Sequence, residues 1–194
     1  SHGGAGCVRT GTVYSNCIFI DNHADWGGAL TFHASGKILN CTFIDNRADR
    51  YGGALSTGFE YDYMELSILD CNFDGNTAPL GGAIQAKGLN ILIDDSNFKN
   101  NVATDYGGAI NIEADDVTIR DSIFNSNKAY INGGAIHIKG KKTQVQNSSF
   151  LSNEAIPDVD KLDDGLGGAI YVNSSMAFIT DNDFRLNTAR NGSA

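Results

Sequence analysis

Proline is scarce in this chain of 194 residues, which has only 2 Pro beside 23 Gly. Abundant glycine without proline, in a chain that is 41% hydrophobic, indicates a folded domain and not a linker. The chain also lacks any apolar run close to the roughly 20 residues that a membrane-spanning helix needs. Its first residues, "SHGGAGCVRTG", lack the charged and apolar segments of a signal peptide. The chain is therefore either cytosolic or a piece of a longer protein, and the repeats described below favour the second.

Basic residues are few as well, with 14 Lys and Arg against 23 Asp and Glu, a net charge of -9. An acidic chain repels phosphate backbones, which argues against nucleic-acid binding. The 4 Cys contain no Cys-x-x-Cys pair, so the spacing typical of a zinc site is missing.

An internal repeat is the dominant feature of the sequence. The stretch "CTFIDNRADRYGGAL" (41–55) nearly copies "CIFIDNHADWGGAL" (17–30), and a Phe-x-x-Asn unit followed by Ala and then Gly-Gly-Ala recurs along the chain. The repeated pairs are Phe19/Asn22, Phe43/Asn46, Phe73/Asn76, Phe98/Asn101, Phe124/Asn127, Phe150/Asn153 and Phe184/Asn187. A period near 25 residues with occasional insertions predicts a solenoid.

The repeat is written in strands. Apolar residues alternate with period 2 in short runs bounded by Gly, Asn and Asp, as at Ile110 and Ile112 or Val117 and Ile119, and no sustained helical stripe occurs. Each coil then has about three short strands, and coils stack in parallel about 4.8 Å apart. We predict an all-β fold: one right-handed, single-stranded parallel β-helix of about seven coils, about 25 residues each, spanning residues 1–194.

The recurring residues predict columns along such a rod. Phenylalanines stack inside, and Cys17, Cys41 and Cys71, two residues before a Phe, also point inward, whereas Cys7 points outward. The Asn or Asp before each of these inward residues closes a tight corner, and the Asn of Phe-x-x-Asn forms an amide ladder at a second corner. Gly-Gly supplies a bend, and the remaining side chains vary because they face water.

Phe-x-x-Asn combined with Gly-Gly-Ala-Ile or Gly-Gly-Ala-Leu resembles the repeat of the polymorphic outer-membrane protein family of autotransporters. The fuller pattern, "NCTFIDN" followed by "GGAL", also resembles adhesin-like surface proteins of methanogenic archaea. The resemblance covers roughly residues 3–189 and implies an extracellular, adhesive β-helix with no catalytic residues. It implies no particular ligand.

Two insertions interrupt the repeat, at 57–65 and 156–166. The first interleaves Phe59, Tyr61 and Tyr63 with acidic residues, so these aromatic rings either contact a sugar or protein partner or pack back onto the rod. Trp26 and Tyr51 precede Gly-Gly in adjacent coils, where we expect them to stack, as corner packing or as an aromatic binding strip.

The second insertion carries Asp158, Asp160, Asp163 and Asp164, a spacing that allows calcium but departs from the EF-hand pattern. A solvated acidic loop is the alternative, and we expect no other cofactor. Cys17, Cys41 and Cys71 are expected to be free thiols, although their spacing in the column does not exclude a disulfide.

The sequence therefore favours a non-catalytic, monomeric, extracellular module that attaches to a protein or glycan on another cell. A polysaccharide lyase or glycoside hydrolase on the same scaffold is the alternative, because fold alone does not decide function. A third possibility is a purely structural stalk.

Overall fold

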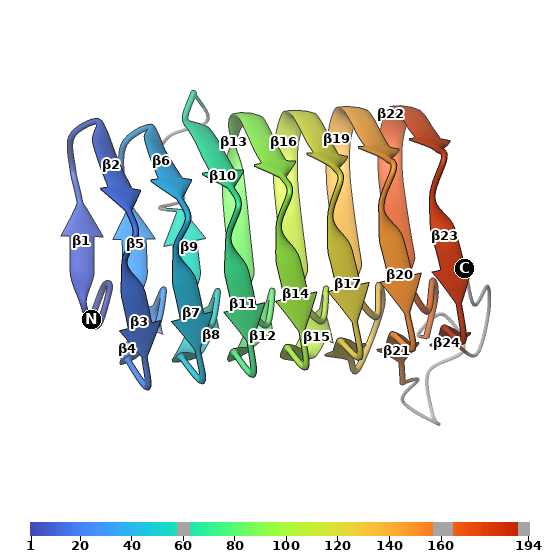
Figure 1. Ribbon diagram of the computed structural model, residues 1–194, viewed down its shortest axis with the longest axis horizontal. Helices are drawn as coiled ribbons and strands as arrows, with labels where there is room; N and C mark the ends of the chain where they lie inside the picture. The colour runs from blue at the N-terminus through green and yellow to red at the C-terminus, as the bar shows by residue number, and fades with distance from the viewer. Residues whose placement is uncertain (58–62, 157–164, 190–194) are drawn as a thin grey trace.

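The computed structural model describes residues 1–57, 63–156 and 165–189, which form a rod of stacked coils (Figure 1). Every strand in the described residues pairs in parallel with the equivalent strand of a neighbouring coil. The predicted parallel β-solenoid is therefore confirmed. The described residues contain no helix long and apolar enough to cross a membrane.

Three sheets run the length of the rod. The phenylalanine sheet contains β3 (Ile18–Ile20), β7 (Thr42–Ile44), β11 (Asn72–Asp74), β14 (Asn97–Lys99), β17 (Ile123–Asn125), β20 (Ser149–Leu151) and β23 (Asp183–Arg185). The alanine sheet contains β4 (His23–Trp26), β8 (Arg47–Tyr51), β12 (Thr77–Leu80), β15 (Val102–Tyr106), β18 (Lys128–Ala129), β21 (Glu154–Ala155) and β24 (Thr188–Ala189).

The third sheet, here called the bent sheet, changes character along the chain. Its early coils use two short strands each: β1 (Gly6–Val8), β2 (Thr12–Ser15), β5 (Leu30–Phe32), β6 (Gly36–Leu39), β9 (Leu55–Thr57) and β10 (Glu65–Leu69). Its later coils use one continuous 11-residue strand each: β13 (Ile84–Asp94), β16 (Ile110–Arg120), β19 (Ile136–Gln146) and β22 (Ile170–Thr180). The first insertion lies between β9 and β10, as the sequence predicts.

Seven copies of the repeat make about six turns, about 26 residues apart. The difference from the predicted seven coils of about 25 residues has a simple cause. Seven strands in one column enclose six intervals, and the two insertions lengthen the average turn.

Phenylalanine stacking fills the interior. Adjacent rings from Phe19 to Phe184 lie 4.7–4.9 Å apart between centroids and within 1–10° of parallel. This spacing matches the distance between coils in a sheet, so one aromatic side chain per coil fills the column without gaps. Isoleucine, leucine and alanine side chains from the other two sheets complete the buried core.

Two corners per coil adopt the left-handed conformation. The predicted one lies at the Asx residues Asn16, Asn40, Asp70, Asp95, Asp121, Asn147 and Asp181, where φ is 48–57°. The second directly precedes each ladder Asn, at Asp21, Asp45, Gly75, Asn100, Ser126, Ser152 and Leu186. The prediction that residues between the fixed positions are free to vary is wrong at this second corner, because a positive φ restricts which residues fit.

The glycine pair makes the third bend. The first glycine of each pair has a positive φ, for example 58° at Gly52. A Cβ atom on Gly53 would lie 2.1 Å from the carbonyl oxygen of Gly82 in the next coil, so the second glycine permits close approach of the backbones.

Candidate functional site

The interior columns are fully occupied by stacking. Each ladder Asn accepts two hydrogen bonds at Oδ1, from the backbone N–H and from Nδ2 of the Asn in the preceding coil, over 2.8–3.1 Å. From Asn46 onward, Nδ2 also donates to the carbonyl oxygen of the preceding coil's Phe. Asn127 and its buried neighbours therefore have no polar atom available for a ligand.

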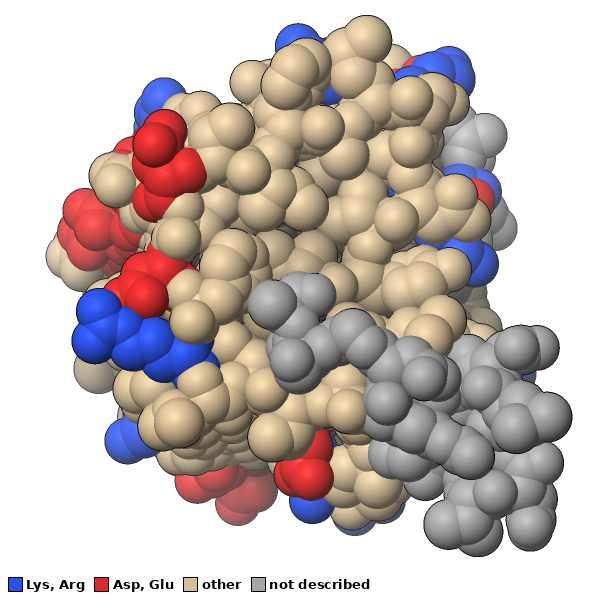
Figure 2. Space-filling view, turned by 90° about the vertical axis from the view of Figure 1, so that its right-hand side faces the viewer, with Lys and Arg blue, Asp and Glu red and all other residues tan. Residues whose placement is uncertain are grey.

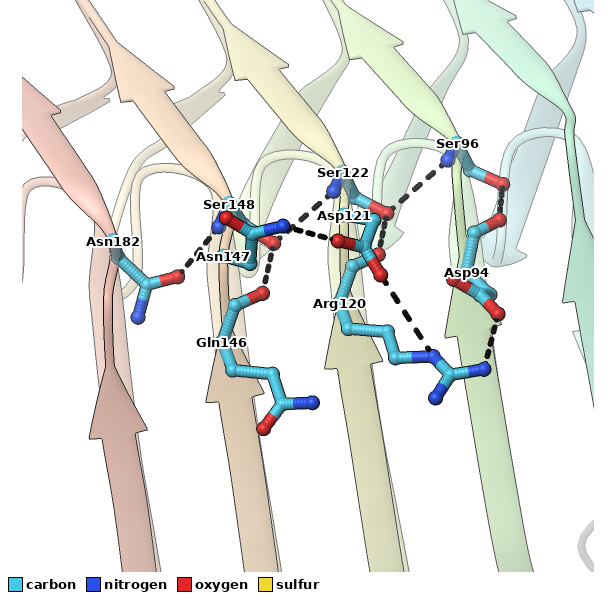
Figure 3. A network of polar contacts seen from close by, with 9 residues as sticks. All are labelled: Asp94, Ser96, Arg120, Asp121, Ser122, Gln146, Asn147, Ser148 and Asn182. Atoms are coloured by element: carbon cyan, nitrogen blue, oxygen red, sulfur yellow. Dashed lines mark hydrogen bonds and ion pairs between the residues drawn. The ribbon is translucent and has the colours of Figure 1, made fainter.

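A second polar ladder follows the Asx corner (Figure 3). The Ser122 hydroxyl donates to the carbonyl oxygen of Arg120 at 2.7 Å and accepts the backbone N–H of Ser96 at 3.1 Å. Ser148 repeats the arrangement, and its own N–H donates to Asn182 Oδ1 at 2.9 Å. The ladder joins successive coils through side chain and backbone alternately.

The cysteines belong to this same ladder. Cys71 Sγ donates to the Leu39-equivalent carbonyl of its own coil, that of Leu69, at 3.1 Å, and accepts the N–H of Cys41 at 3.5 Å. A thiol and a hydroxyl thus do the same work, which explains why Ser replaces Cys in later coils. Burial raises the pKa of the Cys71 thiol to about 11 and also raises that of Cys41, so neither thiol is suited to nucleophilic chemistry.

All four cysteines are free in the structure. Cys7 is exposed and pairs in register with Thr31, so its side chain points outward, as predicted. Among residues 1–57, 63–156 and 165–189, no group of three or more His, Cys, Asp or Glu side chains is arranged to hold a metal ion. Asp158, Asp160, Asp163 and Asp164 lie outside the described residues.

Charged side chains fasten the outer surface of the Asx corner (Figure 3). Arg120 donates to Asp94 Oδ2 in the preceding coil at 2.6 Å, and Asn147 Nδ2 donates to Asp121. The hydrogen bond from Asp94 raises the pKa of Arg120. These contacts join neighbouring coils and leave no concave surface between them.

The predicted aromatic corner is formed, with a different geometry from the one expected. Trp26 and Tyr51 meet edge to face, with centroids 5.1 Å apart and planes at 82°, and they do not stack in parallel. His2 stacks on Trp26 at 4.9 Å, so the rings form one cluster at the start of the rod. Farther along this corner, Tyr106 and Tyr171 flank the buried His137.

The first insertion rejoins the rod beside the bend of β13. Tyr63 is exposed and Met64 is buried, whereas Phe59 and Tyr61 lie outside the described residues. The N–H of Leu89 donates to the Met64 carbonyl oxygen at 2.8 Å. The Lys87 N–H donates to Thr57 Oγ1 at 2.6 Å, and both ends of the insertion are thereby tied to residues 87–89.

An open groove of about 420 Å³ begins at this point. Its lining residues come from the bends of three successive strands: Lys87, Gly88, Glu113, Ala114, Asp115, Lys139, Gly140 and Lys141. The register of strand pairs skips Leu89, Asp115 and Lys141, and the strands bend there, along the upper edge of the rod in Figure 1. Small residues at 88, 114 and 140 form the floor between two rows of longer side chains.

The groove carries charges of both signs. Glu113 lies in register between Lys87 and Lys139, and Lys141 donates to Asp115 at 2.7 Å. The bend of β16 is acidic and that of β19 is basic, so the pairing of opposite charges fixes the register of these two coils. The remaining hydrogen-bonding capacity faces solvent and is available to a polar ligand.

Sequence reasoning did not find this groove. The available signal was the Gly or Ala that separates charged residues at one repeat position, in "KGL", "EAD" and "KGK". Those segments were treated as ordinary outward positions because nothing in the sequence shows that the strand bends there.

A family model confirms the architecture. The model described as "Right handed beta helix region" matches residues 15–189. This chain belongs to the right-handed β-helix family. Neither the comparison with curated proteins nor the comparison with solved structures found a match. Members of the right-handed β-helix family share a scaffold, and the groove and insertions are what this chain adds to it.

Proposed function

We propose that this right-handed β-helix is a non-catalytic attachment module displayed on a cell surface, and that the groove at the bend of β13, β16 and β19 holds its ligand. The observation that carries the proposal is the position of the groove beside the first insertion. The repeat commits its interior to ladders, so binding has to use the outer surface. The groove is a concave polar surface next to the exposed ring of Tyr63.

The lining favours a polar ligand, such as a glycan or a polar protein segment. Three ammonium groups and two carboxylates line the groove and offer donors and acceptors along three coils. The shallow, open form suits an extended chain more than a compact molecule. An aromatic ring at one end can cover the apolar face of a sugar.

The test is a glycan array and a cell-binding assay on the whole chain and on two variants. Lys141→Ala opens the ion pair with Asp115, and Lys99→Ala removes an exposed lysine from the phenylalanine sheet as a matched control. We expect Lys141→Ala and Tyr63→Ala each to weaken binding about tenfold, with Lys99→Ala unchanged. Equal binding by all variants would place the ligand elsewhere, and no binding to any glycan or cell would favour a structural stalk.

Glycan cleavage is the second candidate, because Glu113 and Asp115 line the same groove. Hydrolysis of a glycosidic bond needs two carboxyl groups on opposite sides of the bond. A reducing-sugar release assay on the array's positive glycans separates the two functions. Release that disappears in Glu113→Gln or Asp115→Asn would overturn the attachment proposal, and binding without release would support it.

A further inference from the structure

The two ends of the rod are complementary, and we propose that they dock head to tail, so that a second copy of this chain stacks on the first. Each coil interacts with the next through a fixed pattern of donors and acceptors. The pattern has a direction, and the described chain leaves its donors open at one end and its acceptors open at the other.

The donors lie at the C-terminal end. In the preceding coil, four N–H groups donate forward: Asn147 to Thr180 O, Ser148 to Asn182 Oδ1, Ser152 to Arg185 O and Asn153 to Asn187 Oδ1. The equivalent N–H groups belong to Asp181, Asn182, Leu186 and Asn187, and they have no partner among the described residues.

The acceptors lie at the N-terminal end. In the second coil, the Asn16, Cys17, Asp21 and Asn22 N–H groups donate to Leu39 O, Cys41 Sγ, Ile44 O and Asn46 Oδ1. The equivalent acceptors of the first coil are Ser15 O, Cys17 Sγ, Ile20 O and Asn22 Oδ1, and no described backbone N–H group from another coil donates to them. Four open donors therefore face four open acceptors in the same order along the chain.

The side chains match as well. In the register of the bent sheet, Ile179 pairs with Val145 at one end, and Tyr14 pairs with Ile38 at the other, so stacking would place Ile179 on Tyr14. Phe184 would stack on Phe19 and continue the phenylalanine column. An uninterrupted column would bury rings that now lie at its two ends.

The end coils also expose apolar side chains that inner coils bury. Ile179 is 44% exposed, whereas Ile93, Ile119 and Val145, which share its inward position, are fully buried. Figure 2 looks onto this end, where uncharged residues fill the middle of the visible surface and charged ones lie toward its rim. Unpaired strand edges and exposed apolar surface together favour pairing with another chain.

The occupant is a second copy because only the same repeat supplies this spacing, register and order of acceptors. Such a contact joins two different surfaces, so it continues as an open linear array and does not close as a symmetric dimer. This replaces the expectation of a monomer, which rested on the sequence without the end geometry.

Sedimentation velocity and electron microscopy of the whole chain over a wide concentration range test the proposal. We expect linear end-to-end oligomers that grow with concentration. Ile179→Lys and Tyr14→Lys each put an ammonium group into the contact and should raise its dissociation constant about 100-fold. Ile123→Lys, on an exposed residue in the middle of the phenylalanine sheet, is the matched control and should assemble normally.

A mixture of the two end variants gives a sharper result. Each variant keeps one intact end, so the mixture should form dimers and stop there, while each variant alone stays monomeric. If Tyr14→Lys fails to fold by circular dichroism, Asn182→Cys serves instead, because stacking places it over Cys17 at a distance that permits an intermolecular disulfide. A chain that stays monomeric at every concentration, or oligomers that persist in both end variants, would overturn the proposal.

Discussion

Asn76 Oδ1 accepts two hydrogen bonds from Asn46, one from its backbone N–H and one from its Nδ2, both at 3.0 Å. Asn76 Nδ2 in turn donates to Phe43 O and to Asn101 Oδ1, each at 3.0 Å. One buried amide thus connects three coils. Only a side chain that both accepts and donates can occupy this position, which explains why asparagine recurs there without an aspartate.

The first prediction concerns this ladder. Asn76→Asp keeps the acceptor but removes both donated bonds and places a carboxylate against Asn101 Oδ1. We expect it to lower the free energy of unfolding by about 3 kcal/mol, because a buried charge and two unsatisfied acceptors result. Asn72→Asp, at an exposed position of β11, is the control and should change stability by less than about 0.5 kcal/mol in urea titrations. Equal stability of both variants would contradict the role of the ladder.

The second prediction separates the thiol of Cys71 from its ladder function. Cys71→Ser keeps an acceptor for the Cys41 N–H and a donor for the Leu69 carbonyl oxygen, so we expect a change below about 1 kcal/mol. Cys71→Ala leaves the buried N–H of Cys41 without its acceptor and should cost about 2 kcal/mol. Chemical denaturation of both variants measures the difference. A loss in Cys71→Ser as large as that in Cys71→Ala would show that packing of sulfur, and not hydrogen bonding, matters.

Burial of His137 predicts a loss of stability in mild acid. Burial, with a smaller contribution from Lys139, lowers the pKa of His137 from 6.5 to about 4. Between these pH values the unfolded chain binds a proton that the folded chain does not, so stability falls as pH decreases from about 6.5 to about 4, by about 3 kcal/mol. His137→Gln introduces the residue found at Gln85 in the same column and should remove this part of the pH dependence. His23→Gln, on an exposed side chain, is the control and should keep it.

The fourth prediction uses the strained corner of the last coil. Leu186 has a φ of 56°, a conformation that branched apolar residues adopt at a cost, whereas Asn100 occupies the same corner two coils after Asp45. Leu186→Asn should therefore stabilise the chain by about 1 kcal/mol. Leu151→Asn, in β20 without a positive φ, is the matched control and should give no gain. Thermal melts at concentrations below end-to-end assembly make the comparison, and a gain in the control alone would refute it.

The sequence by itself determined the β-helix, the phenylalanine and asparagine columns and the Asx corner. Each depends on one residue type repeated at one position, and a repeat that stacks on itself brings equivalent residues together. Local chemistry and periodicity are sufficient for that inference, because every coil meets the same neighbour at the same spacing.

Tertiary structure alone decided the edge-to-face contact of Trp26 and Tyr51, the bend that opens the groove, and the complementary ends. These features depend on how side chains of different coils are oriented and on where the strands curve, which no single coil encodes. The second corner lies between the two cases. Aspartate, glycine, asparagine and serine share its backbone conformation without sharing a side chain, so the sequence showed variation where the backbone held one conformation.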